Sequence, residues 1–307
     1  MIRRSLIVTP GNVEAKLAKA EGFPVDILML DLEDGVPNTA AAKARARELL
    51  GAALSPSRFK AREPAIRING PRTEWFLDDI RFVCGLDIPT VVVPMVEDEA
   101  DMIYVERTLD ACGAPERLGL ILLIETPAGV LNLQKMVEAS PRTNGLIAGG
   151  LDYAMCTHSL SILPMSRSGR ASRHDDDLLF MRQQVLAVAR AYGLSAIDAM
   201  RPGELADLEA FRADAEYSRW LGFDGLDFYH PAFIDIANEV FTPSAEELDW
   251  ADKVLGSNQG GDSGAAASRK VDGRVILPQH VEIARRLRTL SDAIGAEAIG
   301  ADAAGRH

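Results

Sequence analysis

Eight short apolar segments recur along the chain, and each is followed by a longer segment of helical character. The apolar segments are SLIVT around Leu6, DILMLDLE around Leu28, PAIRIN around Ile66, PTVVVPM around Val92, LGLILLIE around Ile121, NGLIAGG around Ile147, LSAID around Ile197 and FDGLDFY around Leu226. The longer segments are rich in Ala, Leu, Glu, Lys and Arg, which favour helices. A strand and a helix repeated eight times predict an α/β fold, a (β/α)8 TIM barrel. An open doubly wound sheet is the alternative.

Two stretches depart from this repeat. The first is a polar insertion after the sixth strand, residues 155–177, which is rich in Ser, Arg and Asp. In a barrel it is expected to form a loop at the catalytic face. The second follows the eighth repeat, where SAEELDWADKVL has the capping pattern of a helix start, with Ser244 three residues before Glu247. A Gly- and Ser-rich stretch then precedes VILPQHVEIARRLRTL, whose apolar residues have helical spacing.

These features predict three parts. They are a TIM-barrel catalytic domain over 1–255, a flexible linker over 256–270 and a C-terminal helical arm over 271–307. Such an arm is either a lid, an element that reaches a neighbouring subunit, or a helix packed on its own barrel.

Composition and charge narrow the class of function. The 33 Lys and Arg residues against 45 Asp and Glu residues give a net charge of −12, which repels polyanions and makes nucleic acid an unexpected partner. No apolar run reaches the roughly 18 residues that cross a bilayer, so no membrane span is expected. The cysteines are Cys84, Cys112 and Cys156, few and far apart, which is typical of a reducing compartment. The first residues lack the apolar region of a secretory signal, and a cytoplasmic location is expected.

Ionisable residues end several of the predicted strands, at the edge where a TIM barrel carries its active site. They are Asp31, Glu33 and Asp34 after the second strand, Arg67 in the third, Glu125 at the end of the fifth and Asp152 after the sixth. Because charges next to Val, Ile and Leu are costly to desolvate unless they are paired, we expect these groups to share one polar site. The alternative is a buried salt bridge from Arg67 that only stabilises the barrel.

Two of these carboxylates suit a metal ion. Glu125 and Asp152, with waters or substrate oxygens in the remaining positions, fit Mg²⁺ better than Zn²⁺. The five histidines have neither HxH nor HExxH spacing, as zinc sites often do. In the run that ends at Asp152, the glycines at 149 and 150 allow backbone N–H groups to approach an anionic substrate closely.

The order of the motifs carries a family resemblance over nearly the whole chain. RSLIVTPGN, LDLEDGV, AIRING, VVVPMVE, IETPAGVLN, GGLDYAM, LSAID, GFDG, HPAFIDIANEVFTPSAEEL and VDGRVILPQHVEIARR follow one another as in the citrate lyase β-subunit-like branch of the HpcH/HpaI aldolase family. That branch includes malyl-CoA and citramalyl-CoA lyases and related thioesterases. The resemblance implies a (β/α)8 barrel, a homo-oligomer (a trimer or a dimer of trimers), and Mg²⁺-dependent chemistry on a carbon–carbon bond beside a CoA or acyl-carrier thioester.

The resemblance also implies roles for single residues. It gives Glu125 and Asp152 as metal ligands, Arg67 as the catalytic and substrate-binding arginine, and Asp31, Glu33 and Asp34 as groups beside the metal that orient its waters. The further residues expected on the substrate or thioester side are Arg4, Gly150, Leu151, Tyr229, His230 and Pro231.

Two positions depart from the family pattern. Leu277 stands where many lyases of the family have an aspartate that acts as acid/base from the C-terminal segment, and Met95 replaces a common lysine. A leucine cannot carry a proton, and Asp272 and His280 are the nearby candidates for that role.

Together these features predict a Mg²⁺-dependent carbon–carbon lyase. Its substrate would be a carboxylated 3-hydroxyacyl thioester, cleaved to a 2-oxo acid and an acyl thioester or formed from them. An acyl-CoA thioester hydrolase on the same scaffold and a non-catalytic ligand-binding homologue are the alternatives.

Overall fold

A computed structural model of the chain describes residues 2–54, 58–160, 176–200, 207–257 and 270–304. The chain forms two compact units, Arg3–Phe241 and Thr242–His307. Among the described residues, no helix is both long enough and apolar enough to cross a lipid bilayer.

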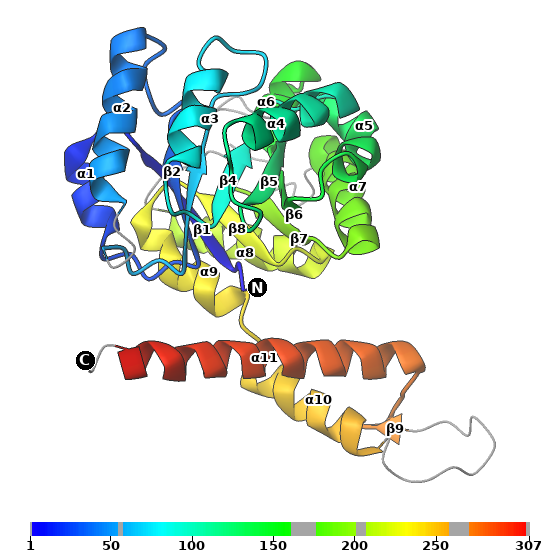
Figure 1. The fold of residues 1–307 in the computed structure, drawn as a ribbon. Helices are drawn as coiled ribbons and strands as arrows, with labels where there is room; N and C mark the ends of the chain where they lie inside the picture. Colours follow the sequence, from blue (N-terminus) through cyan, green and yellow to red (C-terminus); the bar gives the residue numbers. More distant parts are fainter. Residues whose placement is uncertain (1, 55–57, 161–175, 201–206, 258–269, 305–307) are drawn as a thin grey trace. The chain divides into compact units, whose positions relative to one another are not determined.

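The larger unit is a closed barrel of parallel strands (Figure 1). The strands are β1 (Ser5–Pro10), β2 (Ile27–Asp31), β3 (Glu63–Arg67), β4 (Thr90–Val93), β5 (Gly119–Ile124), β6 (Thr143–Ala148), β7 (Ser195–Ala199) and β8 (Gly225–Phe228). Each strand pairs with the next in chain order, and β1 pairs with β8. The predicted TIM barrel is confirmed, and the open sheet is excluded because the barrel strands leave no free edge.

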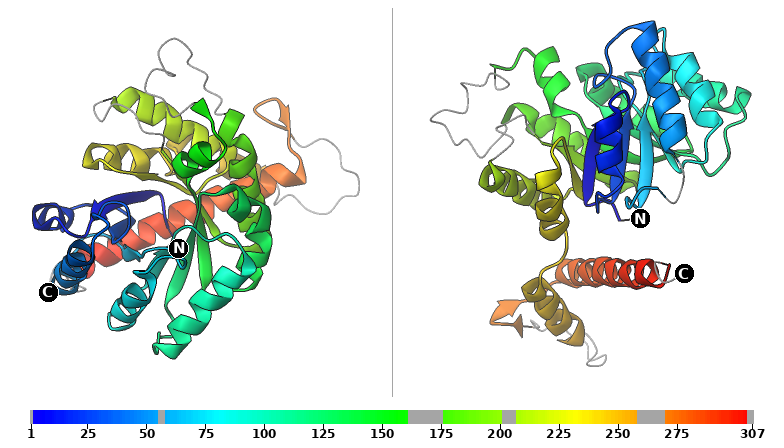
Figure 2. Two further views of the ribbon diagram at one scale, coloured as in Figure 1. Left: turned by 90° about the horizontal axis from the view of Figure 1, so that it is seen from above. Right: turned by 90° about the vertical axis from the view of Figure 1, so that its left-hand side faces the viewer.

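Helices follow the strands and surround the barrel (Figures 1 and 2). They are α1 (Glu14–Ala20), α2 (Ala40–Ala53), α3 (Phe76–Cys84), α4 (Glu99–Ala111), α5 (Pro127–Glu138), α6 (Gly150–Cys156), α7 (Asp176–Tyr192), α8 (Leu208–Leu221), the 3-10 helix η3 (Pro231–Phe233) and α9 (Ile234–Val240). Local sequence sets several of their ends. The side chains of Thr39, Asp98 and Thr126 accept hydrogen bonds from the first turns of α2, α4 and α5. Gly222, at φ 116°, ends α8 in the left-handed region.

Side chains of each strand alternate between the barrel interior and the layer under the helices. The interior is filled by Leu6, Ile27, Met29, Ala65, Val92, Ile121, Leu123, Ile147 and Ile197. Intervening residues such as Ile7, Leu30 and Leu122 belong to the core between strands and helices. In β2, β3 and β5 the next interior position at the carboxyl end of the strand holds a polar residue. These residues are Asp31, Arg67 and Glu125, each two positions after an apolar interior residue.

The smaller unit holds two helices and a short hairpin. Its elements are α10 (Ala245–Ser257), β9 (Lys270–Val271), β10 (Arg274–Val275) and α11 (Pro278–Ala304). Its apolar core consists of Ala251, Val254, Val271, Val281 and Ala284. The predicted capping pattern is present, because Ser244 Oγ accepts from Glu247 N at 3.1 Å and the Glu247 carboxylate accepts from Ser244 N at 2.7 Å.

The division between the units differs from the expected one. Residues 242–255 were expected in the barrel domain, whereas α10 belongs to the smaller unit, because Ala251 and Val254 bury their side chains against residues of β9 and α11. The expected arm over 271–307 contains β10 and all of α11. Most of the expected linker, 256–270, and most of the insertion, 155–177, lie outside the described residues.

Candidate active site

A cavity of about 650 Å³ opens among the carboxyl ends of the barrel strands. The residues expected in the site that line it are Asp31, Asp34, Arg67, Glu125, Gly150, Leu151, Asp152, Tyr229, His230 and Pro231. Glu33 does not line the cavity but lies beside it, with Oε2 3.0 Å from Arg67 Nη1. The fold therefore brings these groups together from strands far apart in the sequence.

Arg67 is held by Asp31 in a bidentate pair. Nε and Nη2 of Arg67 donate to Oδ1 and Oδ2 of Asp31, both at 2.7 Å. Asp31 also accepts from the backbone N–H groups of Glu33 at 2.8 Å and Gly35 at 2.7 Å. Arg67 therefore does form a buried salt bridge, as the alternative interpretation of the sequence expected. The guanidinium nevertheless lines the cavity. Of its five N–H donors, Asp31 engages two and one of the Nη1 donors faces Glu33, so two remain for a ligand.

Glu125 and Asp152 line the same cavity from the segments that follow the neighbouring strands β5 and β6. Glu125 follows β5 and is 4 % exposed, and its Oε1 accepts from Met95 N at 2.9 Å. A Cβ on Gly149 would lie 2.7 Å from the Cβ of Glu125, so glycine allows the end of β6 to pack against this carboxylate. Asp152 lies in the first turn of α6 and is half-buried.

The acids at this site have raised pKa values, mainly because they are buried and to a smaller extent because their negative charges repel one another. Burial, together with the charges of Glu33 and Asp152, raises the pKa of Glu125 well above its usual range, although Arg67 opposes this shift. Burial and Asp34 raise the pKa of Asp152. Burial is also the main cause that raises the pKa of Glu33 to about 8. A bound cation would neutralise part of this charge.

The donor set fits a magnesium ion. The described residues contain no group of three or more His, Cys, Asp or Glu side chains placed to hold a metal, as a closed zinc site would need. Mg²⁺ is commonly held by one or two carboxylates and keeps several of its waters. Glu125 and Asp152 together supply such a pair.

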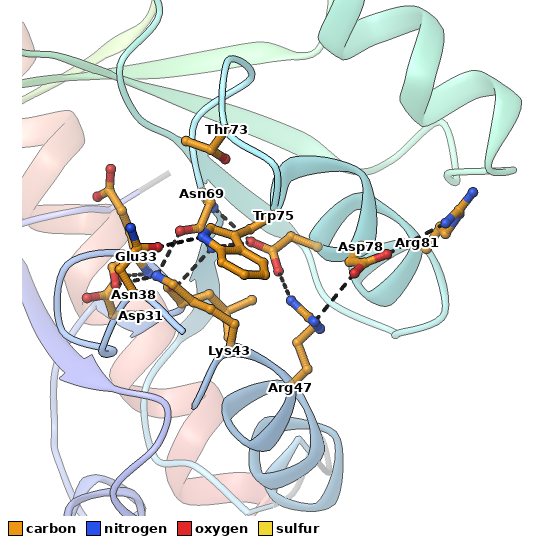
Figure 3. A network of polar contacts seen from close by, with 12 residues as sticks. Asp31, Glu33, Asn38, Lys43, Arg47, Asn69, Thr73, Trp75, Asp78 and Arg81 are labelled. Carbon is orange, nitrogen blue, oxygen red and sulfur yellow. Dashed lines mark hydrogen bonds and ion pairs between the residues drawn. The ribbon is translucent and has the colours of Figure 1, made fainter. Parts of the chain in front are cut away.

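A buried lysine stabilises the segment that carries Asp31 and Glu33 (Figure 3). Lys43 of α2 is 2 % exposed, and its Nζ donates to the carbonyl oxygens of Leu32 at 2.7 Å and Glu33 at 2.8 Å and to Asn69 Oδ1 at 2.8 Å. The sequence prediction missed Lys43. The sequence did contain an indication of its burial, because Lys43 lies at helical spacing from Ala46 and Leu50, on the buried face of α2.

Three further residues of the cavity were missed. Lys16 and Lys19 line it from α1 with exposed side chains. Asp227 lines it from β8, is 5 % exposed, and has no hydrogen-bond partner for Oδ1 among the described residues. Burial, opposed by Arg67 and supported by Asp31, raises the pKa of Asp227 to about 7. The alternation of GLDFY, with Gly225, Asp227 and Tyr229 on one face, was the signal for it.

Arg4 does not belong to this site. It precedes β1 and so lies at the amino end of the barrel, where Nε and Nη2 donate to the Asp26 carboxylate, both at 2.9 Å. The cavity lies among the carboxyl ends of the strands, so Arg4, which was expected on the substrate side, does not line it.

The residues of the C-terminal segment that bear on an acid/base role lie in the smaller unit. Leu277 is 50 % exposed, and its N–H donates to His280 Nδ1 at 3.0 Å. Asp272, at φ 48°, forms the turn between β9 and β10 together with Gly273.

Comparison with known proteins gives a consistent picture. The family profile described as HpcH/HpaI aldolase/citrate lyase matches residues 4–231. A (3S)-malyl-CoA thioesterase of Cereibacter sphaeroides is 31 % identical over 296 residues, which cover 95 % of this chain and 96 % of that protein. The citrate lyase subunit beta of Escherichia coli is 30 % identical over 283 residues, covering 90 % and 86 %.

Solved structures share the fold. The protein CitE from Mycobacterium tuberculosis, in complex with magnesium, acetoacetate and coenzyme A, has a TM-score of 0.73 at 24 % identity and covers 95 % of this chain and 98 % of its own. A citrate lyase beta subunit from the same organism, complexed with oxaloacetate and magnesium, has a TM-score of 0.62 at 26 % identity, covering 79 % and 98 %.

Proposed function

The chain belongs to the HpcH/HpaI aldolase/citrate lyase family, and we propose that it is a Mg²⁺-dependent carbon–carbon lyase acting on a carboxylated 3-hydroxyacyl-CoA. The observation that carries this proposal is one cavity lined by both the Glu125 and Asp152 carboxylates and the Arg67 guanidinium. The products of cleavage are a 2-oxo acid and an acyl-CoA, and the reverse reaction condenses them.

The carboxylate pair supports the metal requirement. Glu125 and Asp152 would hold Mg²⁺, which supplies Lewis-acid polarisation of substrate oxygens when bound. One fold neighbour holds magnesium together with oxaloacetate, a 2-oxo acid of the kind proposed here, and another holds magnesium together with acetoacetate, a 3-oxo acid, and coenzyme A. The raised pKa values of both acids agree with a site whose negative charge is balanced by a cation.

Arg67 supplies the second requirement, a rigid donor for developing negative charge. The bidentate pair with Asp31 fixes the plane of the guanidinium, so its remaining N–H groups are preorganised toward the cavity. There they bind the substrate carboxylate or the carbonyl oxygen on which charge develops during cleavage. Lys43 maintains this geometry because it fixes the backbone at Leu32 and Glu33.

The lysines of α1 support a CoA thioester. Lys16 and Lys19 line the cavity with exposed ammonium groups, although the chain as a whole has a net charge of −12. Two exposed cations beside a cavity suit the phosphate groups of CoA. Replacing both by Glu should raise KM for a CoA thioester at least about tenfold at low salt and leave KM for the matching pantetheine thioester unchanged.

The decisive assay offers malyl-, citramalyl- and citryl-CoA to the purified protein with Mg²⁺. A 2-oxo acid and an acyl-CoA should appear in equal amounts, and removal of Mg²⁺ by a chelator should stop the reaction. If none of these thioesters yields a 2-oxo acid, the proposal is refuted.

A CoA thioester hydrolase is the second candidate, and the similarity to (3S)-malyl-CoA thioesterases over 95 % of the chain favours it. Hydrolysis releases free CoA and a hydroxy acid. Measuring free thiol and 2-oxo acid in the same reaction therefore separates the two activities.

A further inference from the structure

Carbon–carbon cleavage of a 3-hydroxyacyl thioester needs a group that accepts a proton from the hydroxyl and later returns it to carbon. We propose that the Asp227 carboxylate is this proton-transfer group, an inference that rests on the proposed lyase function. Asp227 lines the cavity from β8, and its Oδ1 has no hydrogen-bond partner among the described residues.

The other acids that line the cavity are less suited to accept the proton of the hydroxyl group. Asp31 accepts four hydrogen bonds, two from Arg67 and one each from the N–H groups of Glu33 and Gly35, and so has no free lone pair for a substrate. Glu125 and Asp152 are the proposed metal ligands. Asp34 is exposed to solvent.

Glu33 is the nearest rival. Its Oε2 also has no hydrogen-bond partner within the described part of the chain, but it lies 3.0 Å from Arg67 Nη1 and outside the lining of the cavity. Asp227 is therefore the buried acid with an unengaged oxygen that a substrate in the cavity reaches directly.

The surroundings of Asp227 suit both halves of a proton transfer. The charged groups that face it are Arg67 of β3 and Asp31 of β2, and burial with these neighbours raises its pKa to about 7. An acid with a pKa near the working pH is effective both as a base and, once protonated, as an acid. Arg67 faces Asp227 and lines the same cavity, so the oxyanion donor and the proton acceptor converge on one substrate.

The step is balanced without any further reactant. Oδ1 of Asp227 accepts the proton of the 3-hydroxyl, and the bond between C2 and C3 breaks. C3, which bears the carboxylate, becomes the carbonyl carbon of the 2-oxo acid. The electron pair of the broken bond passes to C2 and the thioester carbonyl as an enolate. Asp227 then returns the same proton to C2, which gives the acyl thioester.

The test compares Asp227→Asn with wild type and with Asp235→Asn, an exposed acid of α9 outside the cavity. In ²H₂O the enzyme should exchange the C2 protons of the acyl thioester when a 2-oxo acid is present. Asp227→Asn should lower both kcat for cleavage and this exchange by at least about 100-fold. Mg²⁺ affinity should stay within about twofold, and Asp235→Asn should match wild type in every measurement.

A second variant covers the case in which the asparagine does not fold. Asp227→Ala leaves space beside the cavity, and added formate should restore part of the lost exchange, which a merely structural aspartate does not predict. Cleavage by Asp227→Asn within about threefold of wild type would overturn the inference, as would loss of exchange in Glu33→Gln but not in Asp227→Asn. If the wild type cleaves no such thioester, the proposed function itself fails, and this inference fails with it.

Discussion

Replacing Asp227 by Asn should stabilise the protein at alkaline pH. The carboxyl group is 5 % exposed, its Oδ1 has no hydrogen-bond partner in the described structure, and it faces both Arg67 and Asp31. A buried carboxylate that is incompletely paired is costly to ionise. Asparagine has the same shape and never ionises, so the variant lacks this cost.

The size of the effect follows from the pKa. The pKa of Asp227 rises from 3.8 to about 7 on folding. The unfolded chain therefore loses this proton first as the pH increases, and the stability of the wild type falls between these two values and is constant above them. Since one pKa unit corresponds to 1.36 kcal/mol, the full cost is about 4 kcal/mol above pH 7 and about 2 kcal/mol at about pH 5.5. The advantage of Asp227→Asn should thus grow by about 2 kcal/mol from about pH 5.5 to about pH 8.5.

Scanning calorimetry of both proteins at these two pH values measures this change. For a domain of this size, an increment of about 2 kcal/mol corresponds to about 4 to 8 °C in Tm. Asp235→Asn, whose side chain is exposed, should show no pH-dependent difference from wild type. If Asp227→Asn were less stable than wild type at about pH 8.5, or if the difference did not change with pH, Asp227 would be an ordinary paired carboxylate and the reasoning would be refuted.

Four further substitutions test the rest of the site. Glu125→Gln or Asp152→Asn should weaken Mg²⁺ binding by at least about tenfold in titration calorimetry without unfolding the barrel, because each removes a charged ligand; unchanged affinity in both would reject the metal site. Arg67→Lys keeps the charge but loses the planar fork, so kcat/KM should fall by at least about 100-fold, and activity within about twofold of wild type would mean that Arg67 is only structural. Lys43→Met removes one hydrogen bond from each of three acceptors, of which the two backbone carbonyls keep another donor, and the substitution should lower the free energy of unfolding by about 3 kcal/mol in urea titrations. The exposed Lys135→Met is its control, and an equal loss in both would argue against the network.

The sequence by itself determined the barrel. Short β-rich apolar runs, each followed by a segment of helical character, can be read directly from the local sequence, and all eight predicted strands are present. It also determined which end of the strands carries the chemistry, because Asp31, Arg67, Glu125 and Asp152 each interrupt or follow an apolar run.

Only the tertiary structure decided which partners these groups have. Arg67 and Asp31 lie on adjacent strands, and the bidentate pair depends on a register that local sequence does not fix. The partner of Arg4 was likewise not predictable from the local sequence. Arg4 precedes β1, so the direction of this strand places it at the amino end of the barrel, beside Asp26. Charge alone gave no reason to separate it from Arg67.

Burial was the other property that the sequence left open. Lys43 and Asp227 look like ordinary polar residues in a helix and a strand, and they became important only when neighbouring elements enclosed them. The pKa of Asp227 and the hydrogen bonds of Lys43 are consequences of that enclosure. Burial also decided to which unit α10 belongs. Ala251 and Val254 of α10 pack against apolar residues of β9 and α11, and this packing makes α10 part of the smaller unit. Desolvation and packing are sums over residues distant in the chain, and so they appear only once the chain has folded.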